Sequence, residues 1–338
     1  PDDEVGHGGI EVLGPYGVQS VSGITLGTAL PRYPEQAMVY KTVDTVISKD
    51  DVLQMAESFG ISGSVEERRS DYVVKNNPYT FEIRKEAGYM AYTWDERWKG
   101  YDTRDRPENL PTDEECRKIA ETFLTSHGLM PEGAVFSSVS QGGQRIFSNR
   151  SGGTPIVTYE DRDVHFTDTL SGYPVAGSGT YVTIGGGGDV LKVGKHWRDA
   201  EPYKEFPILP PEEAIEELKQ TGVVTVVSSP KRAIVEEIKL CYYATPPGTE
   251  QPYLKPTYYV RGTVEGESET GTFFQYIPAV PELGKGRTMK SDMGESRFSD
   301  RMAYRVSLVS PLVLPSPDIP CRPWFIRRSI LPYQRTMP

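Results

Sequence analysis

A run of four glycines, Gly185–Gly188, is the part of this 338-residue chain that most resembles a phosphate-binding loop. Such a loop needs a Gly-Lys-Ser/Thr sequence at the start of a helix, where backbone N–H groups hold the phosphate. No such sequence follows the run, and Lys192 and Lys195 fall on a predicted strand. We therefore predict a flexible hairpin turn. The Gly-x-Ser-x-Gly motif of a nucleophilic serine is also absent from the sequence.

Metal-ligating residue types occur without the spacing of a metal site. The histidines are scattered along the chain: His7, His127, His165 and His196. They lack the i, i+4 pairing and the Cys/His spacing that zinc sites use. Asp161, Asp163 and Asp168 alternate and offer oxygen ligands of the kind that calcium takes, but not in the fixed loop positions of an EF-hand. We predict that these acids are solvated and that the protein holds no metal or cofactor.

Paired carboxylates are plentiful, and two carboxyl groups in one cleft can supply general acid and base catalysis. Most pairs fall on the first turn of a predicted helix or on an exposed face, where the helix dipole or solvent accounts for them. They are Glu212/Glu213, Glu216/Glu217, Glu236/Glu237 and Asp113/Glu114/Glu115. We therefore predict a non-enzymatic protein. A hydrolase whose site the sequence does not reveal stays as a third reading.

An aromatic stretch around residue 94 has the composition of a platform for a sugar or a peptide. Its aromatic, acidic and basic members are Tyr92, Trp94, Trp98, Tyr101, Asp95 and Arg97. Aromatic side chains on a half-buried sheet more often pack in the core or in a seam between domains. Both readings stay open at this stage.

Three helices are predicted from the capping residues at their N-terminal ends and the glycines after their C-terminal ends. Ser48 is an N-cap residue, and Thr112 with Glu115 has the spacing of a capping box. The third helix begins at Pro211, and each helix is followed by a glycine suited to its C-terminal end. The predicted helices are 48–59, 112–127 and 211–221, followed by Gly60, Gly128 and Gly222.

The remaining chain alternates between short Tyr-, Val-, Phe- and Ile-rich stretches and turns, which predicts strands. Helices set among consecutive hairpin-like strands, without regular βαβ alternation, indicate an α+β fold. We predict two or three modules, each a short helix packed on an antiparallel sheet, with extended N- and C-terminal arms. The segments are an arm at 1–30, modules at 31–107, 108–200 and 201–285, and a basic extension at 286–338.

The stretch 206–280 resembles the secreted PepSY-type module. It is also similar to extracytoplasmic proteins that restrain a cell-wall sensor kinase and to uncharacterised archaeal and bacterial surface proteins. The resemblance lies in a helix opening followed by a Pro-x-Tyr-x-φ-x-Gly strand: Pro211–Ala214, then Pro256, Tyr258, Val260 and Gly262. It implies a non-enzymatic extracellular module that binds or restrains peptides and proteins.

The net charge of −10 is unevenly distributed. From Gly286 onward there are nine Lys/Arg against four Asp/Glu, a surplus of +5. Binding to nucleic acid would instead require a basic face on the folded domain. We expect the basic tail to dock onto an acidic surface, either its own or a neighbour's.

Several features suit an extracellular or cell-surface protein. No window approaches 18 consecutive apolar residues, and the chain starts at Pro1, so we expect that a signal peptide was removed. Asn149 begins an N-glycosylation sequon. Of three cysteines, we expect Cys116 and Cys241 to be packed thiols, and a disulfide at Cys321 stays open.

The N-terminal arm carries no charge between Glu11 and Arg32 and is β-prone. A free strand of this kind would aggregate, so we expect it to pair, either in its own sheet or with another subunit. The residues expected to make the contact are Val12, Leu13, Tyr16, Val18, Val21, Ile24 and Leu26.

The C-terminal tail is too rich in proline for a central strand and should run extended over a surface. Its expected anchors are Trp324, Phe325, Arg327 and Arg328. The arm and the tail together predict a homo-oligomer or polymer, such as a surface-layer or filament subunit, built by strand addition. The alternative is a secreted regulatory or inhibitory module that binds a sensor kinase, a protease or a cell-wall enzyme.

Overall fold

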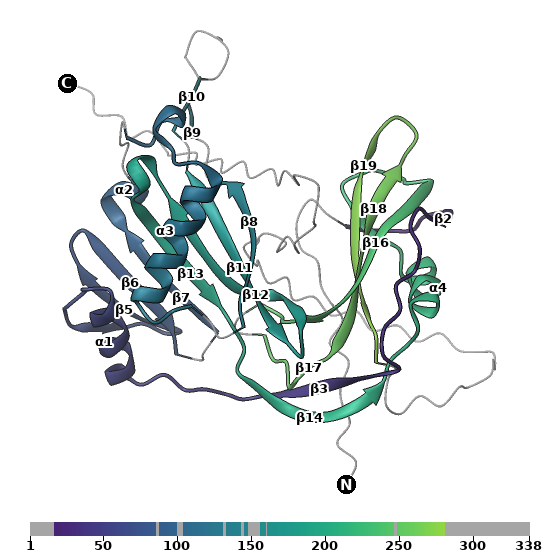
Figure 1. The fold of residues 1–338 in the computed structure, drawn as a ribbon, viewed down its shortest axis with the longest axis horizontal. Coiled ribbons are helices and arrows are strands. Elements are labelled where there is room, and N and C mark those ends of the chain that lie inside the picture. Colours follow the sequence, from purple (N-terminus) through teal and green to yellow (C-terminus); the bar gives the residue numbers. More distant parts are fainter. Residues whose placement is uncertain are drawn as a thin grey trace. The chain divides into compact units, whose positions relative to one another are not determined.

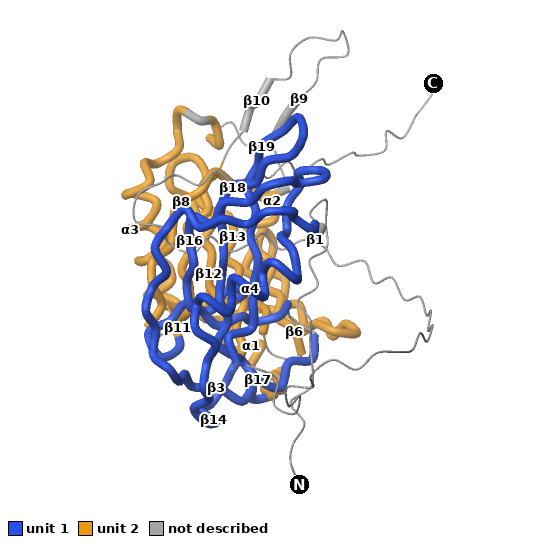
Figure 2. The backbone as a smooth tube through the Cα atoms, turned by 90° about the vertical axis from the view of Figure 1, so that its right-hand side faces the viewer, with its two compact units in different colours: residues 1–43, 170–177, 199–311 blue, residues 44–169, 178–198, 312–338 orange. Residues whose placement is uncertain are grey.

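The computed structural model describes residues 17–85, 88–99, 104–130, 133–142, 145–147, 156–159, 161–246 and 249–280. The chain divides into two compact units (Figure 2). Unit 1 comprises residues 1–43, 170–177 and 199–311, and unit 2 comprises residues 44–169, 178–198 and 312–338. Each unit is therefore assembled from discontinuous stretches of chain.

The prediction of an α+β fold with a small antiparallel sheet under each helix is wrong. Strands dominate the described residues, and fourteen of them belong to one mixed hydrogen-bonded sheet, against four α-helices. The strand β12 (Tyr173–Ile184) belongs to both units: its first half pairs with β16 in unit 1 and its second half with β13 in unit 2. Pairing between strands so distant in sequence leaves no trace in local periodicity.

Unit 2 is a sheet with the strand order β8-β11-β12-β13-β7-β6-β5-β4, covered on one face by α1 and α3 (Figure 1). The helical elements are α1 (Lys49–Ser58), α2 (Asp95–Lys99), α3 (Asp113–Ser126) and the 3₁₀ turns η1 (Pro107–Asn109) and η2 (Gly186–Gly188). The strands are β4 (Val65–Glu67), β5 (Asp71–Asn76), β6 (Tyr79–Arg84), β7 (Tyr89–Trp94), β8 (Val135–Gln141), β11 (Arg162–Leu170) and β13 (Val190–His196), with a separate hairpin of β9 (Arg145–Phe147) and β10 (Ile156–Tyr159).

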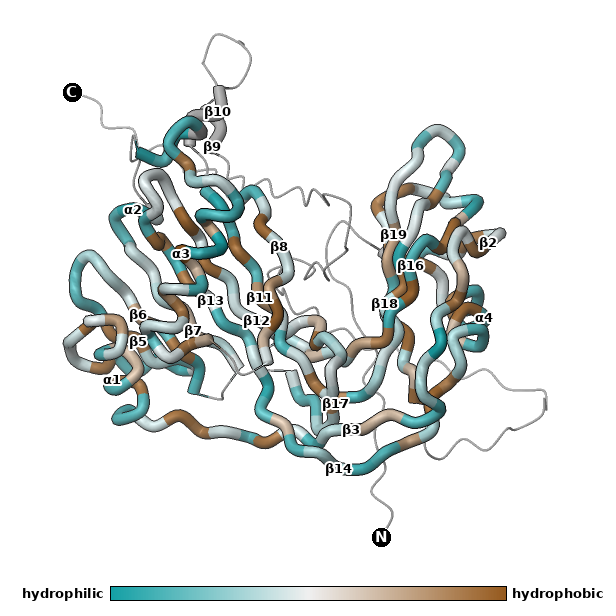
Figure 3. The backbone as a smooth tube through the Cα atoms, in the orientation of Figure 1, coloured by the Kyte–Doolittle hydropathy of each residue, from teal (hydrophilic) through white to brown (hydrophobic). Residues whose placement is uncertain are grey.

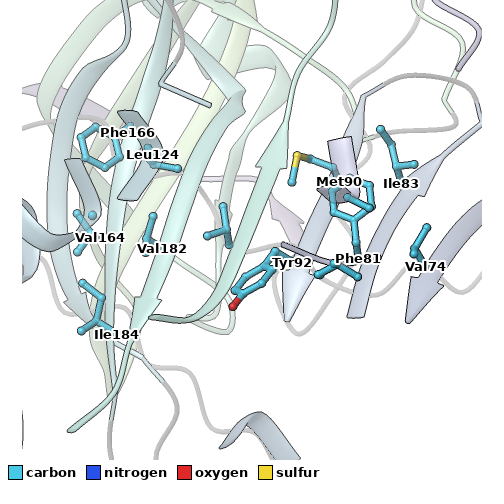
Figure 4. Close-up of a cluster of buried hydrophobic side chains, with 14 of the residues drawn as sticks. Val74, Phe81, Ile83, Met90, Tyr92, Leu124, Val164, Phe166, Val182 and Ile184 are labelled. Carbon is cyan, nitrogen blue, oxygen red and sulfur yellow. The ribbon is translucent and has the colours of Figure 1, made fainter. Parts of the chain in front are cut away.

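The core of unit 2 lies between this sheet and its two helices. Val52 of α1 and Leu124 of α3 are fully buried in one cluster with strand residues such as Phe81 and Val182. Figure 4 shows Leu124 together with Phe81 and Val182. Because side chains alternate along a strand, the residues between these core positions point to the opposite face of the sheet.

The predicted helix starts are confirmed. The Ser48 hydroxyl accepts from the backbone N–H of Asp51, whose carboxylate accepts from the Ser48 N–H in return. Thr112 and Glu115 form the same reciprocal pair at α3. The third helix ends at Gly222, whose φ of 84° is a conformation that favours glycine. These caps form because each needs only residues within one turn.

Unit 1 contains a sheet in the order β1-β15-β19-β18-β16, with β2 and the first half of β12 parallel beside β16, and a separate sheet β14-β3-β17. Its helix is α4 (Pro211–Thr221). The strands are β1 (Gly17–Gln19), β2 (Gly23–Leu26), β3 (Gln36–Thr42), β14 (Ala200–Pro207), β15 (Val223–Thr225), β16 (Arg232–Tyr243), β17 (Tyr253–Leu254), β18 (Pro256–Glu265) and β19 (Thr270–Pro278).

The helix α4 covers one face of the first of these sheets. Its Ala214 and Leu218 are fully buried in a cluster with Tyr258, Val260 and other alternate residues of β16, β18 and β19. Buried and half-buried residues alternate along β18 from residue 258 onward, and the strand contains both hydrophobic and hydrophilic residues (Figure 3). The residues in between therefore point away from α4 and form a second face.

Candidate functional site

The glycine run is the turn of the β12–β13 hairpin, as predicted, but it is tightly packed. A Cβ atom on Gly186 would lie 1.4 Å from the carbonyl oxygen of Arg104. The Gly186 N–H donates to Asp105 at 2.9 Å, and the Gly185 N–H donates to the Asp189 carbonyl, also at 2.9 Å. These N–H groups bind the protein itself, so the run has a structural role here.

Arg97 holds this turn in place from inside unit 2. Its Nη2 lies 2.5 Å from the Asp105 carboxylate, and its other terminal nitrogen pairs with Asp189. The Arg97 side chain is only 3% exposed. Arg97 is therefore a structural residue and not the surface group of an aromatic platform.

The aromatic stretch around Trp94 is divided between the core and the surface. Tyr92 is buried in the core, and Trp94 packs on Tyr79 with ring centroids 5.5 Å apart. Asp95 and Trp98 line a surface depression. Tyr101 lies outside the described residues. The predicted platform is thus only partly assembled.

The depression beside Trp98 is open and polar, with a volume of about 250 Å³. Thr80 donates a hydrogen bond to Asp95, and Lys192 Nζ lies 4.9 Å from the centre of the Trp98 ring. The lining residues are Arg68, Val73, Lys75, Thr80, Glu82, Thr93, Asp95 and Trp98. Small-molecule pockets are usually larger, enclosed and mostly apolar, so this surface does not fit that class.

A serine–histidine contact on the face of unit 2 opposite α1 and α3 has the distance of a nucleophile and its base. Ser140 Oγ and His165 Nε2 are 3.1 Å apart, and burial lowers the pKa of His165. Asp163, which would orient the imidazole in a triad, accepts a hydrogen bond from Thr183. Within the described part of the chain, no group of three or more His, Cys, Asp or Glu side chains could hold a metal ion.

An aromatic cluster lies on the face of the unit 1 sheet opposite α4. We call Tyr243, Tyr259, Phe274 and Tyr276 the tyrosine platform. Tyr259 and Tyr276 are direct cross-strand partners, and the Tyr276 ring centroid lies 4.8 Å from that of Tyr243, 5.2 Å from Tyr259 and 6.2 Å from Phe274. All four side chains are half-buried and lie on the face of the sheet opposite α4.

The hydroxyl groups of Tyr243 and Tyr276 stay protonated. Burial raises the pKa of Tyr276 well above its ordinary value, and the neighbouring Cys241, Tyr259 and Tyr243 add to the effect. Burial also raises the pKa of Tyr243. The rings therefore present neutral faces and hydroxyls that can both donate and accept hydrogen bonds.

Charged side chains border the platform on β16 and β18. Glu237 pairs with Lys239 at 2.5 Å and with Arg261 at 2.9 Å. Glu236 is exposed, and the Thr263 hydroxyl donates to its carboxylate at 2.6 Å. The Glu237 carboxylate is thus neutralised within the face, whereas the Glu236 carboxylate is exposed to solvent.

The described part of the N-terminal arm pairs within its own unit. The strand β1 is antiparallel to β15, and β2 is parallel to β16. Val21 and Ile24 pack against the buried cluster under α4, whereas Val18 and Leu26 are 54% and 47% exposed. We predicted that the arm pairs either in its own sheet or with another subunit. The described segment pairs in its own sheet. Val12, Leu13 and Tyr16 lie outside the described residues.

Cys116 and Cys241 are buried free thiols, as predicted. Burial raises the pKa of Cys116 to about 11 and that of Cys241 to about 12, so both are protonated at neutral pH. Three further sequence-based assignments lie outside the described residues: Cys321, the sequon at Asn149, and the tail anchors Trp324, Phe325, Arg327 and Arg328.

The fold defines a mostly β protein of two sheet-based units, one of which carries an aromatic face. No protein-family profile and no curated protein matches this chain. Among solved structures it is similar to an uncharacterised protein from Eubacterium rectale ATCC 33656, with 13% sequence identity, a TM-score of 0.48, and coverage of 78% of this chain and 88% of that one. A likeness at this level carries no argument about function, and the PepSY-type resemblance stays a prediction.

Within the described residues, no helix combines the length and the apolar character needed to cross a membrane. Sequence reasoning missed the tyrosine platform. Its signal was present in three adjacent aromatic pairs, Tyr242-Tyr243, Tyr258-Tyr259 and Phe273-Phe274, each of which places one ring on either face of its strand. Alternation separates the two faces of a strand but does not say which face a helix covers.

Proposed function

We propose that this protein is a non-catalytic binding protein whose tyrosine platform holds an extended, proline-rich segment of polypeptide. The single observation that carries the proposal is the contact of three tyrosine rings and one phenylalanine ring on the face of unit 1 opposite α4. Surfaces lined by aromatic rings recognise proline-rich segments, which are already extended before they bind.

The dimensions of the platform match such a segment. A polyproline II helix has three residues per turn and a rise of about 3.1 Å per residue, so one turn is ~9 Å long. The ring centroids of Tyr243, Tyr259 and Phe274 lie 4.8–6.2 Å from the central Tyr276. The platform is therefore about one turn across and accommodates prolines spaced three residues apart.

The chemistry also matches. A polyproline II backbone makes no internal hydrogen bonds, so its carbonyl groups need donors. The hydroxyl of the half-buried Tyr243 is such a donor, and the half-buried rings of the platform offer an apolar surface to a pyrrolidine ring. Tyrosine supplies this large contact area with few rotatable bonds, so little conformational entropy is lost on binding.

The test is the binding of a fluorescent nonapeptide with proline at every third position, measured by anisotropy. The comparison peptide has alanine in place of proline. Two host proteins are used, the full chain and the full chain with Pro320→Ala and Pro323→Ala, because the chain contains a proline-rich segment of its own. We expect the proline peptide to bind more tightly than the alanine peptide to at least one of these two proteins.

Tyr259→Ala in the same host should weaken peptide binding about tenfold or more, since truncating an aromatic anchor removes a dominant contact. The matched control is Tyr203→Ala, which removes a 49% exposed tyrosine on β14, away from the platform. Equal binding by the Tyr259 and Tyr203 variants, or no preference for proline in either host, would exclude the proposal. Unchanged melting temperatures show that the variants remain folded.

A further inference from the structure

We infer that the polar depression beside Trp98 binds one ring of a neutral polysaccharide whose sugars carry their hydroxyl groups in equatorial positions. The depression lies on unit 2, and none of its lining residues belongs to the tyrosine platform. The inference therefore goes beyond the proposed function and does not depend on it.

The depression forms where short side chains of the sheet lie beside long ones. Lys75 on β5 is the cross-strand partner of Thr80 on β6, and Thr80 is the partner of Thr93 on β7. The two threonines are short, whereas Lys75 and Trp98 of α2 are long, and all four line the depression. Its volume of about 250 Å³ is below the roughly 300–1,000 Å³ of pockets that enclose drug-sized ligands. It therefore has room for a single sugar ring.

The polar lining offers both donors and acceptors to sugar hydroxyl groups. The carboxylates of Glu82 and Asp95 accept hydrogen bonds, and Arg68 and Lys75 donate them. Thr80 donates to Asp95 and so holds this carboxylate in place. A hydroxyl group can donate to a carboxylate in a charge-assisted hydrogen bond, which is stronger than a neutral one. Because two cations balance two carboxylates, the lining favours a neutral sugar over an acidic or phosphorylated one.

Trp98 supplies the aromatic wall of the depression. Its side chain is half-buried, and Lys192 Nζ lies 4.9 Å from the centre of its ring and 5.6 Å from that of Tyr181, a contact that orients the indole. The face of an aromatic ring is electronegative and attracts the C–H groups of a sugar, which the neighbouring oxygens polarise. A pyranose ring whose hydroxyl groups all lie around its edge leaves C–H groups on both faces. Such a ring therefore fits Trp98 best.

The openness of the depression favours a ring within a chain over a free monosaccharide. An enclosed pocket would exclude the neighbouring rings, whereas this depression is open to solvent. A peptide fits less well, because the side chains that anchor a peptide need apolar pockets. Among the lining residues, only Val73 and Trp98 are apolar.

Isothermal titration calorimetry of the full chain tests the ligand class. The neutral probes are cellohexaose and chitohexaose, and the charged comparison is a hexamer of β-1,4-linked glucuronic acid, which has the same ring geometry. We expect at least one neutral probe to bind, with an affinity that changes less than about twofold between low and high salt. The charged hexamer should bind more weakly. Binding of the charged hexamer alone, or of none of the three, would overturn the inference.

Substitutions in the full chain test the site. Trp98→Ala should weaken binding of the neutral probe about tenfold or more, and Trp98→Tyr, which keeps a ring, should restore most of it. Glu82→Gln keeps the size of the side chain but removes its charge, and should weaken binding about threefold or more. The matched control is Glu57→Gln, an exposed residue of α1, which covers the other face of the sheet. It should leave binding unchanged.

Melting temperatures show whether each variant is folded. If Trp98→Ala does not fold, the comparison of Glu82→Gln with Glu57→Gln decides. Equal binding by these two variants would place the sugar elsewhere and overturn the inference. If Trp98→Ala weakens binding of the proline nonapeptide while no sugar binds, the depression is a peptide site and the inference fails.

Discussion

Arg97 and Asp105 form an ion pair in the interior of unit 2, with a nitrogen–oxygen distance of 2.5 Å and side chains only 3% and 9% exposed. The same Asp105 oxygen accepts the N–H of Gly186, and Arg97 also pairs with Asp189. The pair therefore connects the chain after α2 to the turn of the β12–β13 hairpin.

Removing one member of this pair should strongly destabilise the protein. Arg97→Ala leaves a buried carboxylate without its cation, and such changes cost about 3–5 kcal/mol. Lys118→Ala is the matched control, because the Lys118–Glu114 pair is 70% and 67% exposed and is worth well under ~1 kcal/mol. Urea denaturation gives the free energy of unfolding of both variants. If Arg97→Ala lowers the free energy of unfolding by no more than the control does, the Arg97–Asp105 pair does not stabilise the fold.

Gly186→Ala should be among the most damaging single-methyl additions in unit 2. The new Cβ would lie 1.4 Å from the Arg104 carbonyl oxygen, so the backbone would have to move, at a cost of about 3 kcal/mol or more. Gly187→Ala separates this clash from backbone strain. Its φ is 76° with no neighbour within 4 Å, which predicts a smaller loss of about 1–2 kcal/mol. Thermal unfolding orders the two variants, and the reverse order would contradict the packing account.

The stability of unit 2 should fall as the pH drops from about 6.5 towards 4. Burial, followed by the charges of Lys192 and Arg84, lowers the pKa of His196 to about 4, and the Tyr89 ring lies 5.0 Å from the imidazole. In the unfolded chain the pKa of histidine is about 6.5. Between these values the unfolded state binds the additional proton, so the free energy of unfolding decreases with falling pH.

His196→Gln removes this titration. The difference in unfolding free energy between the wild type and His196→Gln should change by about 2–3 kcal/mol between pH 7.5 and pH 4. Other titrating groups cancel in this comparison because both proteins share them. Parallel stability curves for the two proteins would show that His196 titrates normally in the folded state.

The N-terminal arm should contribute to folding through Ile24 and not through Val18. Ile24 is half-buried against the cluster under α4, so Ile24→Ala should cost about 1–2 kcal/mol. Val18 is 54% exposed, and Val18→Ala should change stability by less than about 0.5 kcal/mol. Chemical denaturation measures both. A similar effect of the two changes would mean that the packing of Ile24 against the cluster under α4 does not stabilise the fold.

Sedimentation of the same two variants bears on self-association through the arm. If this segment also joins subunits, Val18→Ala should shift the sedimentation coefficient while leaving stability unchanged. An unchanged coefficient for both variants assigns the described arm to its own sheet alone.

The local features of this fold could be predicted from the sequence. The caps at Ser48 and Thr112 formed as predicted because their partners, Asp51 and Glu115, lie three residues away. Strands also form in stretches rich in Tyr, Val, Phe and Ile, as predicted, for example at 79–84 and 89–94. Cap geometry and strand alternation depend on contacts within a few residues, so the sequence by itself determines them.

Only the tertiary structure decided how these elements combine. Residues Val175 and Ala176 pair with Tyr242 and Tyr243, more than sixty positions away, and this parallel pairing replaced the small predicted sheets with one large mixed sheet. The tertiary structure also decided which face of strands β18 and β19 is covered by helix α4. The tyrosine platform lies on the other face. Register and layer choice depend on the summed burial of distant residues, a quantity that no local pattern contains.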